Sequence, residues 1–285
     1  MRRICESRKK LGRGFVLLAP PLTHPTLSEH LVEDESHHQR LLADAQRLRG
    51  RIYVEDGAIR PSDLTAGRHI QAVDDLSWHL LTVDGGDRVT ACIRYLVHRP
   101  GVSYPELAVS RSAAAHSPKL GPWVREAVQS ELDYAARRGF SYVELGGWAI
   151  SEELRCTTEA ISTLVMVYAL SQLLGGARAL STATTRHHSS SILRRVGGGP
   201  LIARGAEVPS YYDPHYKCEM ELLSFDSTAP NPRYAGWIRD CRDALREVPI
   251  VCRQDAHACT SDLRLLQAAV TSYVTAARDL VALGS

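Results

Sequence analysis

The chain has 285 residues, of which 44% are hydrophobic and 23% charged, and its formal net charge at pH 7 is +2. This balance is typical of a folded globular protein and gives no sign of bulk binding to nucleic acid. No stretch approaches eighteen consecutive apolar residues, and the apolar run after the basic N-terminal stretch is too short for a signal-peptide core. We therefore expect a cytoplasmic protein without a membrane span.

The seven cysteines are scattered, and no two of them have C-x-x-C spacing. This argues for a reducing compartment and against a disulfide framework or a zinc site. The adjacent His37 and His38 would point to different faces of a helix, which favours solvated side chains over metal ligands. We predict no metal site.

The first 36 residues contain three closely spaced prolines and mixed charge, so we predict a flexible arm over 1–36. Helical spacing of apolar residues then predicts a helix over 35–50, and 51–64 either continues it or forms an ordered loop. Next, Asp84-Gly85-Gly86-Asp87 predicts a hairpin turn between strands at 79–83 and 88–97.

Arg94 lies in the second hairpin strand, on the opposite face from the alternating Val89, Ala91 and Ile93. An arginine in mid-strand rarely stays without a partner. It either pairs with a carboxylate or points into a cleft. We therefore single out Arg94 as a functional candidate.

A strand–helix–strand unit is predicted next, with strands at 104–110 and 140–147 and a helix over 122–139. Pro122 suits the first turn of this helix and Gly139 its end. The length is that of a right-handed crossover, so the two strands should run parallel.

A buried helix, a strand and a short basic helix are predicted from 151 to 199. The helix is apolar on nearly all sides from Ala160 to Leu174, and Gly175-Gly176 ends it. A last strand is predicted at 216–225, and the remaining chain carries helical patterns at 234–245 and 262–283.

This order of elements resembles the GNAT acyltransferase fold. Within that superfamily the chain resembles the acyl-homoserine-lactone synthases and, most of all, the N-acyl amino acid synthases that take their acyl group from acyl carrier protein. The resemblance covers about 45–225, and four features carry it: the acidic segment 74–79, Arg94, Val109-Ser110-Arg111 as the E-x-S-R segment, and the pair of segments 143–154 and 181–198.

The resemblance implies an α/β (α+β) fold with a mixed central sheet, two parallel core strands and flanking helices. It implies an acyltransferase domain over 37–227, followed by a helical extension over 228–285. The position of the motif glutamate holds Ala108, and Glu106, on the same face of a strand, is predicted to replace it. The acetyl-CoA pyrophosphate signature and the usual general-acid tyrosine are both missing, which disfavours an ordinary acetyl-CoA enzyme.

N-acylation needs a deprotonated amine, a polarised thioester carbonyl and close contact between them. Parallel strands that diverge leave backbone groups free for a pantetheine arm and for an oxyanion. Burial in an apolar strand would raise the pKa of Glu106 or Glu144 and suit either as base, while a structural ion pair is the alternative role. The predicted catalytic set is Glu106, Arg94, Arg111 and Glu144, and His79, His187 and His188 are the alternatives for the base.

Two further sets follow from the resemblance and from the residue types. Glycines permit close approach of a ligand to the backbone, and the predicted substrate-binding set is Asp75, Trp78, His79, Val109, Ser110, Gly146, Gly147 and Trp148. A helix that begins with serines can hold a phosphate, and the predicted phosphopantetheine and carrier set is Arg186, His188, Ser189, Ser190, Arg194 and Arg195.

We therefore expect an enzyme that moves a long-chain acyl group from acyl carrier protein, or from acyl-CoA, to the amine of an amino acid or related small amine. The thioester is a cosubstrate, and we expect no tightly bound cofactor. Acyl-homoserine-lactone synthesis from S-adenosylmethionine and a non-catalytic acyl- or carrier-binding module are the alternatives. A homodimer through the helix at 262–283 is a further expectation. Acceptor, chain length and the identity of the base stay open.

Overall fold

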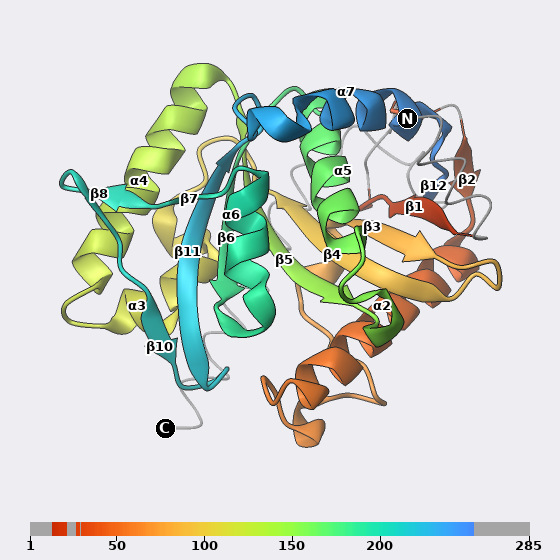
Figure 1. Ribbon diagram of the computed structural model, residues 1–285, viewed down its shortest axis with the longest axis horizontal. Helices are drawn as coiled ribbons and strands as arrows, with labels where there is room; N and C mark the ends of the chain where they lie inside the picture. The colour runs from red at the N-terminus through yellow and green to blue at the C-terminus, as the bar shows by residue number, and fades with distance from the viewer. Residues whose placement is uncertain (1–12, 22–26, 29, 254–285) are drawn as a thin grey trace.

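The computed structural model describes residues 13–21, 27–28 and 30–253 of the chain. They form a mixed sheet with helices on both faces (Figure 1). The sheet has ten strands, with the order β10-β11-β6-β5-β4-β3-β1-β12-β2 and with β7 paired to β11. The predicted α/β class with a mixed central sheet is confirmed.

The strands are β1 Gly14–Leu18, β2 Leu31–Glu33, β3 Trp78–Val83, β4 Val89–Val97, β5 Ser141–Ile150, β6 Ala177–Thr184, β7 Gly199–Pro200, β8 Ile202–Ala203, β9 Ala206–Glu207, β10 Tyr211–Asp213, β11 Cys218–Asp226 and β12 Ile250–Cys252. The α-helices are α2 Glu35–Glu55, α3 Ala113–His116, α4 Gly121–Arg138, α5 Glu159–Leu173, α6 Ser189–Val196 and α7 Ala235–Ala244. Single turns of 3₁₀ helix include η2 Asp74–Leu76, η3 Tyr104–Glu106, η4 Ala108–Arg111, η5 Glu152–Leu154 and η6 Arg186–His188.

The alternation of side chains along each strand divides the core between the two faces of the sheet. On β5, Tyr142 packs with the residues of α4, whereas Val143 and Leu145 pack with those of α5. On β4, Cys92 packs under α2, and Ile93 faces α5. Helices α2 and α4 therefore cover one face, and α5, α6 and α7 cover the other (Figure 1).

Helix α5 is enclosed between the sheet and α7. Its residues from Ser162 to Ser171 are all buried, as the apolar pattern predicts. It connects β5 to β6, which run parallel. The crossover of the central parallel pair is therefore α5.

The prediction of a strand at 104–110 is wrong, because this segment forms η3 and η4. Ser103 and Glu106 make a reciprocal capping box, in which the Glu106 carboxylate accepts from the Ser103 backbone N–H at 2.8 Å. The Ser110 hydroxyl donates to the Leu107 carbonyl at 2.7 Å. Such local bonds compete with strand pairing, and Pro105 has no N–H to give to a ladder.

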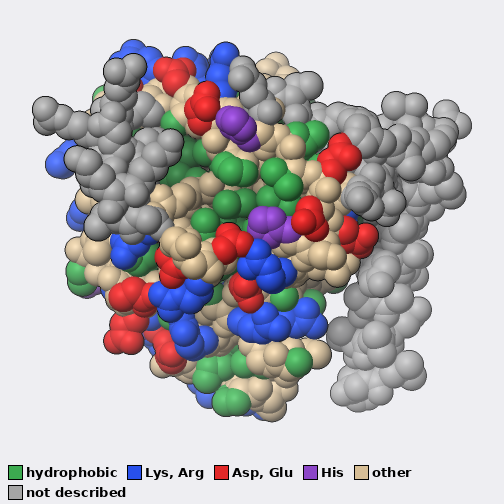
Figure 2. All heavy atoms as spheres, turned by 90° about the vertical axis from the view of Figure 1, so that its right-hand side faces the viewer, with side chains coloured by type: hydrophobic (Ala, Val, Ile, Leu, Met, Phe, Trp, Pro, Cys, Tyr) green, Lys and Arg blue, Asp and Glu red, His purple; other side chains and the backbone are tan. Residues whose placement is uncertain are grey.

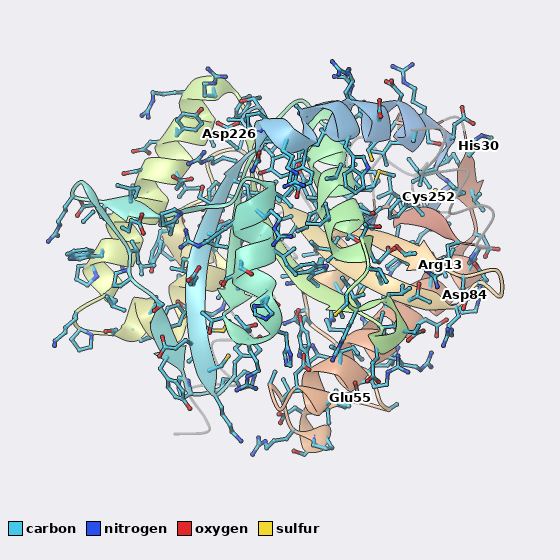
Figure 3. All side chains as sticks on the ribbon, in the orientation of Figure 1. Arg13, His30, Glu55, Asp84, Asp226 and Cys252 are labelled. Atoms are coloured by element: carbon cyan, nitrogen blue, oxygen red, sulfur yellow. The ribbon has the colours of Figure 1, made fainter. Side chains whose placement is uncertain are left out.

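The prediction of a loose arm over 1–36 is wrong for β1, which pairs with β3 through all five of its residues. The predicted helical extension also contributes to the sheet, because β12 pairs in parallel with β1 and β2. Figure 3 labels Cys252 of β12 and His30, which precedes β2, at this edge. The helix predicted at 262–283, and with it the expected dimer contact, lies outside the described residues.

Acidic and basic side chains lie intermixed on the face seen in Figure 2, so no large area of one charge forms there. This agrees with the net charge of +2. Within the part of the chain that the structure describes, no helix has both the length and the apolar character needed to cross a bilayer.

Candidate active site

Strands β5 and β6 stop pairing before they end. Their register runs from Ser141 opposite Ala177 to Leu145 opposite Ser181. Beyond this point, β5 continues with β4 as its partner and β6 continues with β11. We call the facing backbone edges of 146–150 and 182–184 the β5/β6 notch. The sequence predicted divergence of two parallel strands but assigned it to 104–110 and 140–147, which is wrong for the first of them.

A β-bulge lies on one wall of the notch. Cys92 pairs with Ala149 and Arg94 with Gly146, so Gly147 and Trp148 together oppose the single residue Ile93. Gly147 has a φ of 61°, which glycine adopts at little cost. Bulges re-aim the strand next to functional sites.

The two glycines make room for guanidinium groups of this chain. A Cβ at Gly147 would lie 2.7 Å from Arg49 Nη1, and a Cβ at Gly146 would lie 3.1 Å from Arg94 Nη2. These two arginines are enough to explain why glycine occupies both positions. The approach of a ligand to the glycine backbone stays a prediction. The proximity of the glycines to two arginines ties the notch to the charged cluster described next.

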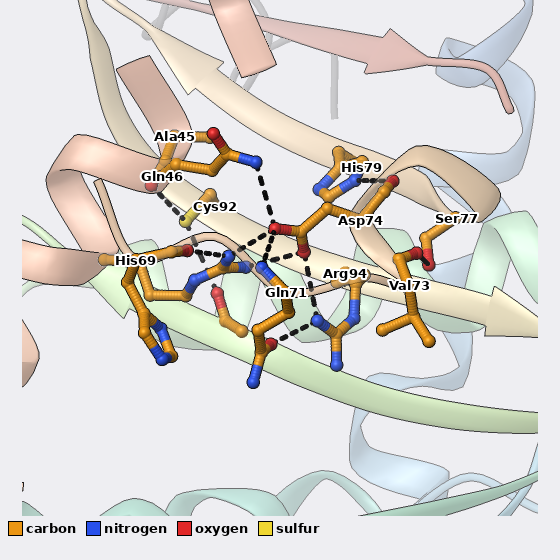
Figure 4. Close-up of polar contacts among 12 residues, drawn as sticks. Ala45, Gln46, His69, Gln71, Val73, Asp74, Ser77, His79, Cys92 and Arg94 are labelled. Atoms are coloured by element: carbon orange, nitrogen blue, oxygen red, sulfur yellow. Dashed lines mark hydrogen bonds and ion pairs between the residues drawn. The ribbon is translucent and has the colours of Figure 1, made fainter. Parts of the chain in front are cut away.

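The carboxylate of Asp74 is the centre of a buried polar cluster (Figure 4). Arg49 donates to its Oδ1 at 3.1 Å and to its Oδ2 at 2.6 Å, and Arg94 donates to Oδ1 at 3.0 Å. The amide of Gln46 and the backbone N–H of Gln71 each donate to Oδ2 at 3.0 Å. Burial alone would raise the pKa of Asp74, but Arg49 and then Arg94 outweigh it and hold that pKa well below its usual range.

The cluster has a surplus of positive charge. It contains two arginines and one ionised carboxylate, and the neighbouring His69 and His79 are neutral at pH 7, because burial lowers the pKa of each to about 4. The side chain of Arg94 is 10% exposed, and its buried Nε has no hydrogen-bond partner among the described residues. The buried Nε of Arg49 in the same cluster also has no partner among the described residues, so the cluster holds two buried donors whose acceptors are not protein groups of the described chain.

Three polar side chains of the cluster extend in the same direction, and two of them, His69 and Gln71, are half-buried. In Figure 4 the imidazole of His69, the side-chain amide of Gln71 and the outer nitrogen of Arg94 all point away from Asp74 in one direction. Donor and acceptor groups on this side are suited to a small polar molecule.

Local structure explains how the cluster forms. Gln46 and Arg49 are three residues apart on α2 and share one face of that helix. The Asp74 N–H donates to the Gln71 carbonyl at 2.9 Å, which closes the turn into η2. Arg94 lies in the middle of β4. It was predicted either to pair with a carboxylate or to point into a cleft, and the structure shows that it pairs with Asp74.

Glu144, one of the two predicted bases, has its carboxylate fully engaged. It accepts from His98 Nε2 at 2.9 Å and from the backbone N–H groups of Ala108 and Val109 at 3.0 and 3.2 Å. Burial raises its pKa, but His98 and the two amides outweigh this, and the pKa is lowered. The expected raised pKa is therefore wrong, and Glu144 anchors the 98–109 segment.

Glu106, the other predicted base, lies in η3. Its carboxylate accepts from Arg99 at 2.7 Å and from the Ser103 hydroxyl at 2.5 Å. Partial burial raises its pKa, but the bonds from Ser103 and Arg99 outweigh this and the pKa is lowered, so the expected raised pKa is again wrong. Of the two roles considered for it, the structural ion pair is present.

The segment assigned to E-x-S-R is not on a core strand. Val109 is buried against α4, Ser110 caps its own turn, and Arg111 is exposed. The motif was expected on the first strand of the parallel pair, which is β5. That strand reads Glu144-Leu145-Gly146-Gly147 and contains neither the serine nor the arginine of the motif.

The remaining predicted substrate residues lie in different surroundings. Asp75 is exposed and pairs with Arg253. Trp78 is buried in the core under α5, and Trp148 packs on the same core from the notch side. His79 is buried behind Asp74, with its Nε2 2.8 Å from the Asp74 carbonyl oxygen.

Several members of the predicted carrier set are engaged within the protein. Arg186 donates to the Asp56 carbonyl and, at 2.8 Å, to the Lys217 carbonyl. Arg194 pairs with Glu221 at 2.9 Å. His188 and the preceding His187 both have positive φ, at 60° and 54°, just before helix α6 begins. Ser190 is buried and Arg195 exposed.

Arg49, Gln46 and Asp74 were missed by sequence reasoning, which chose the neighbouring Asp75. A signal was present in α2, where polar Gln46 and Arg49 share the face of the apolar Ala45 and Leu48. A polar pair on a buried helix face predicts a polar partner in the core. Among the described residues, no group of three or more histidines, cysteines and carboxylates is placed to hold a metal ion.

No protein-family model matches the chain, and no curated protein matches it. Solved structures do match. FeeM, an N-acyl amino acid synthase from uncultured soil microbes, has a TM-score of 0.45 and 12% identity, over 76% of this chain and 91% of that one. The CoA-dependent acyl-homoserine lactone synthase MesI has a TM-score of 0.47 and 17% identity, over 73% and 90%.

BjaI, a CoA-dependent acyl-homoserine lactone synthase in a structure with SAM and isopentyl-CoA, has a TM-score of 0.46 and 15% identity, over 85% of this chain and 97% of its own. These proteins belong to the two groups of enzymes that the sequence resembles. At such identities and TM-scores the likeness is a distant one of fold. The function of this chain is therefore inferred from its own residues.

Proposed function

We propose that the protein transfers an acyl group from a phosphopantetheine thioester, carried by acyl carrier protein or by CoA, to the amine of an amino acid or a related small amine. One observation carries this proposal: an unpaired strand edge, the β5/β6 notch, lies directly beside a polar cluster with surplus positive charge. The first feature suits the donor and the second suits the acceptor.

The notch supports the donor side of the proposal. Backbone N–H and C=O groups at 146–150 and 182–184 face each other without strand pairing. The two amides of a pantetheine arm can bond to such an edge as an added strand does. A backbone N–H there is then available to the developing oxyanion of the thioester carbonyl. The α6 segment, with Arg194 and Arg195, remains our predicted contact for the carrier.

The cluster supports the acceptor side. Arg94 uses Nη1 for Asp74 and Gln71, whereas its Nε has no partner among the described residues. A carboxylate of an amino acid can accept from this free side of the guanidinium. Because Arg94 is opposite Gly146 in the β4–β5 register, an acceptor held there has its amine close to the notch. S-adenosylmethionine carries the same amino and carboxylate groups and is a second acceptor to test.

The test is a direct assay of the full-length protein. Lauroyl and palmitoyl thioesters of CoA and of acyl carrier protein are each incubated with pooled amino acids or with S-adenosylmethionine, and products are identified by mass spectrometry. We expect an N-acylated product. Binding of the thioester without transfer to any acceptor would instead support a non-catalytic module and overturn the proposal.

A further inference from the structure

We propose that a clasp of four residues closes the open end of the β5/β6 notch and must release before the pantetheine arm of a thioester donor can enter. The clasp consists of Asp56, Arg155, Arg186 and His187. The inference rests on the proposed function, because it concerns how the donor of that reaction reaches its place. It adds a conformational step that precedes acyl transfer.

The segments that carry the clasp continue directly from the two edges of the notch. Arg155 follows η5, which is the first turn after β5. Arg186 and His187 belong to η6, which is the first turn after β6. Asp56 is the C-terminal cap of α2, and its carboxylate contacts both segments. The clasp therefore lies just beyond the unpaired edges of both strands.

A single oxygen of Asp56 joins the two sides. Its Oδ1 lies 3.5 Å from Nη2 of Arg155 and 3.2 Å from Nε2 of His187. A chain that pairs with β5 and with β6 at once needs about 4.8 Å on either side of its backbone. Two side chains that share one oxygen at hydrogen-bond range leave no such gap between them. A pantetheine arm in the plane of the sheet therefore cannot pass between these segments while the clasp is closed.

Arg186 fastens the same place to a third element. Its Nη1 donates to the backbone carbonyl of Asp56, and its Nη2 donates to the backbone carbonyl of Lys217 at 2.8 Å. Lys217 lies in the turn before β11, the strand that pairs with the outer edge of β6. Arg186 therefore ties the end of α2 to the β6–β11 side of the notch, independently of the Asp56 carboxylate.

Backbone strain is concentrated at the clasp. Four residues that make or adjoin its contacts have positive φ although none is glycine: Cys156 at 59°, His187 at 54°, His188 at 60° and Lys217 at 51°. Residues in this conformation cost energy and persist where the surrounding structure holds them, typically at ligand clamps and switch segments. Relief of this strain therefore offsets part of the cost of opening the clasp.

The contacts of the Asp56 carboxylate are weak enough to open. The exposed fraction of the side chain is 21% for Asp56, 39% for Arg155 and 52% for His187. Pairs with this much access to water contribute little to stability. A donor that fits only the open form binds with an apparent affinity reduced by the fraction of molecules that are open. Weakening the clasp should therefore strengthen donor binding, whereas the loss of a donor contact would weaken it.

Asp56→Ala and Arg155→Gln test the inference. Glu55→Ala is the control, because Glu55 is exposed and pairs with Arg51 on its own helix. The probes are dodecyl-CoA and dodecyl acyl carrier protein, in which a thioether replaces the thioester so that no acyl transfer takes place. Surface plasmon resonance on the full-length protein measures the association and dissociation rates of each probe.

We expect Asp56→Ala to raise the association rate about fivefold, which corresponds to about 1 kcal/mol. The dissociation rate should change little, because the bound state is already open. Arg155→Gln breaks one of the two carboxylate contacts and should give a smaller rise, and Glu55→Ala should give none. A rise with only one of the two probes would support the clasp and identify the carrier of the donor.

The remaining outcomes separate the two proposals. Unchanged or slower association in both Asp56→Ala and Arg155→Gln would overturn the clasp and leave the proposed function standing. An equal rise in Glu55→Ala would also overturn the clasp, because the effect would then come from a change of surface charge. If neither probe binds to the wild type or to Asp56→Ala, both proposals are overturned.

Discussion

Arg49 and Asp74 form an ion pair inside the protein, with Arg49 Nη2 2.6 Å from Asp74 Oδ2 and side-chain exposures of 2% and 1%. Arg94 reaches the same carboxylate from β4 at 3.0 Å. One carboxylate thus holds two arginines from two elements, α2 and β4. The cluster therefore connects α2 to β4 and also carries the surplus positive charge.

Asp74→Asn should destabilise the protein strongly. The amide leaves two buried arginines without an ionised partner, and the removal of one member of a buried pair costs about 3 to 5 kcal/mol. Urea unfolding at pH 7 measures the free energy of unfolding of the variant and the wild type. Asp44→Asn is the control, because Asp44 pairs with Arg47 at the surface of α2, where a pair contributes less than about 1 kcal/mol. Equal losses in the two variants would contradict the prediction.

The stability of the protein should fall as the pH decreases from about 6.5 to about 4. Burial lowers the pKa of His38, His69 and His79 from 6.5 to about 4. In this window the unfolded chain binds protons that the folded protein does not, so acid favours unfolding and stability is present in full above pH 6.5. The free energy of unfolding, measured in urea from pH 7.5 to 4.5, checks the slope. His79→Gln should reduce it, and a pH-independent stability would refute the assignment.

Local patterns were enough to predict some parts of this arrangement. Alternation along one strand identified Arg94 as unusual, and the uniform apolar character of α5 predicted its burial. The contact between Arg49 and Asp74 joins residues 25 positions apart. It depends on how α2 packs on β4, which no local pattern encodes.

The strand predicted at 104–110 shows how local capping bonds can override an apolar composition. Tyr104, Leu107 and Val109 are buried although the segment is not a strand, because the capping box of Ser103 and Glu106 favours turns. The parallel pair was consequently assigned one element too early.

Arg94→Ala should abolish selectivity for acceptors that carry a carboxylate. Removal of one partner of a charge-assisted pair typically costs 2 kcal/mol or more, so kcat/KM for an amino acid should fall at least about 30-fold. The same variant should lose much less activity toward the decarboxylated amine of that amino acid. The control is Arg88→Ala, which removes an exposed arginine that pairs with Asp84 and Glu153. Equal losses for both acceptors would remove Arg94 from the acceptor site.

Gly147→Ala should cost more stability than Gly139→Ala. Both glycines have positive φ, at 61° and 65°, so alanine strains each backbone by a similar amount of about 1 kcal/mol. At Gly139 a Cβ meets nothing within 4 Å, whereas at Gly147 it lies 2.7 Å from a nitrogen of the buried Arg49. Displacement of this guanidinium breaks its bonds to Asp74. Thermal unfolding of the two variants measures the difference in stability. Equal unfolding midpoints would show that the Arg49 side chain can move away from the new methyl group without a loss of stability.

The carboxylate of Asp56 should control the mobility of the two segments that follow β5 and β6. Arg155, after β5, lies 3.5 Å from Asp56 Oδ1, and His187, after β6, lies 3.2 Å from the same atom. Both segments border the notch, so one carboxylate beyond the end of α2 joins its two sides. In Asp56→Ala, amide hydrogen exchange at 151–158 and 185–191 should accelerate, because each segment loses its contact with the Asp56 carboxylate.

Glu55→Ala is the matched control for Asp56, since the neighbouring Glu55 (labelled in Figure 3) is exposed and, within the described part of the chain, its carboxylate pairs only with Arg51 on its own helix, at 3.9 Å. Exchange at both segments should stay at the wild-type rate in this variant. Because Arg186 donates to the backbone carbonyl of residue 56 and not to its side chain, that contact survives in Asp56→Ala. Faster amide exchange is therefore expected only in the segments 151–158 and 185–191. Faster exchange within β5 and β6 themselves would contradict this and show that Asp56 also supports the sheet.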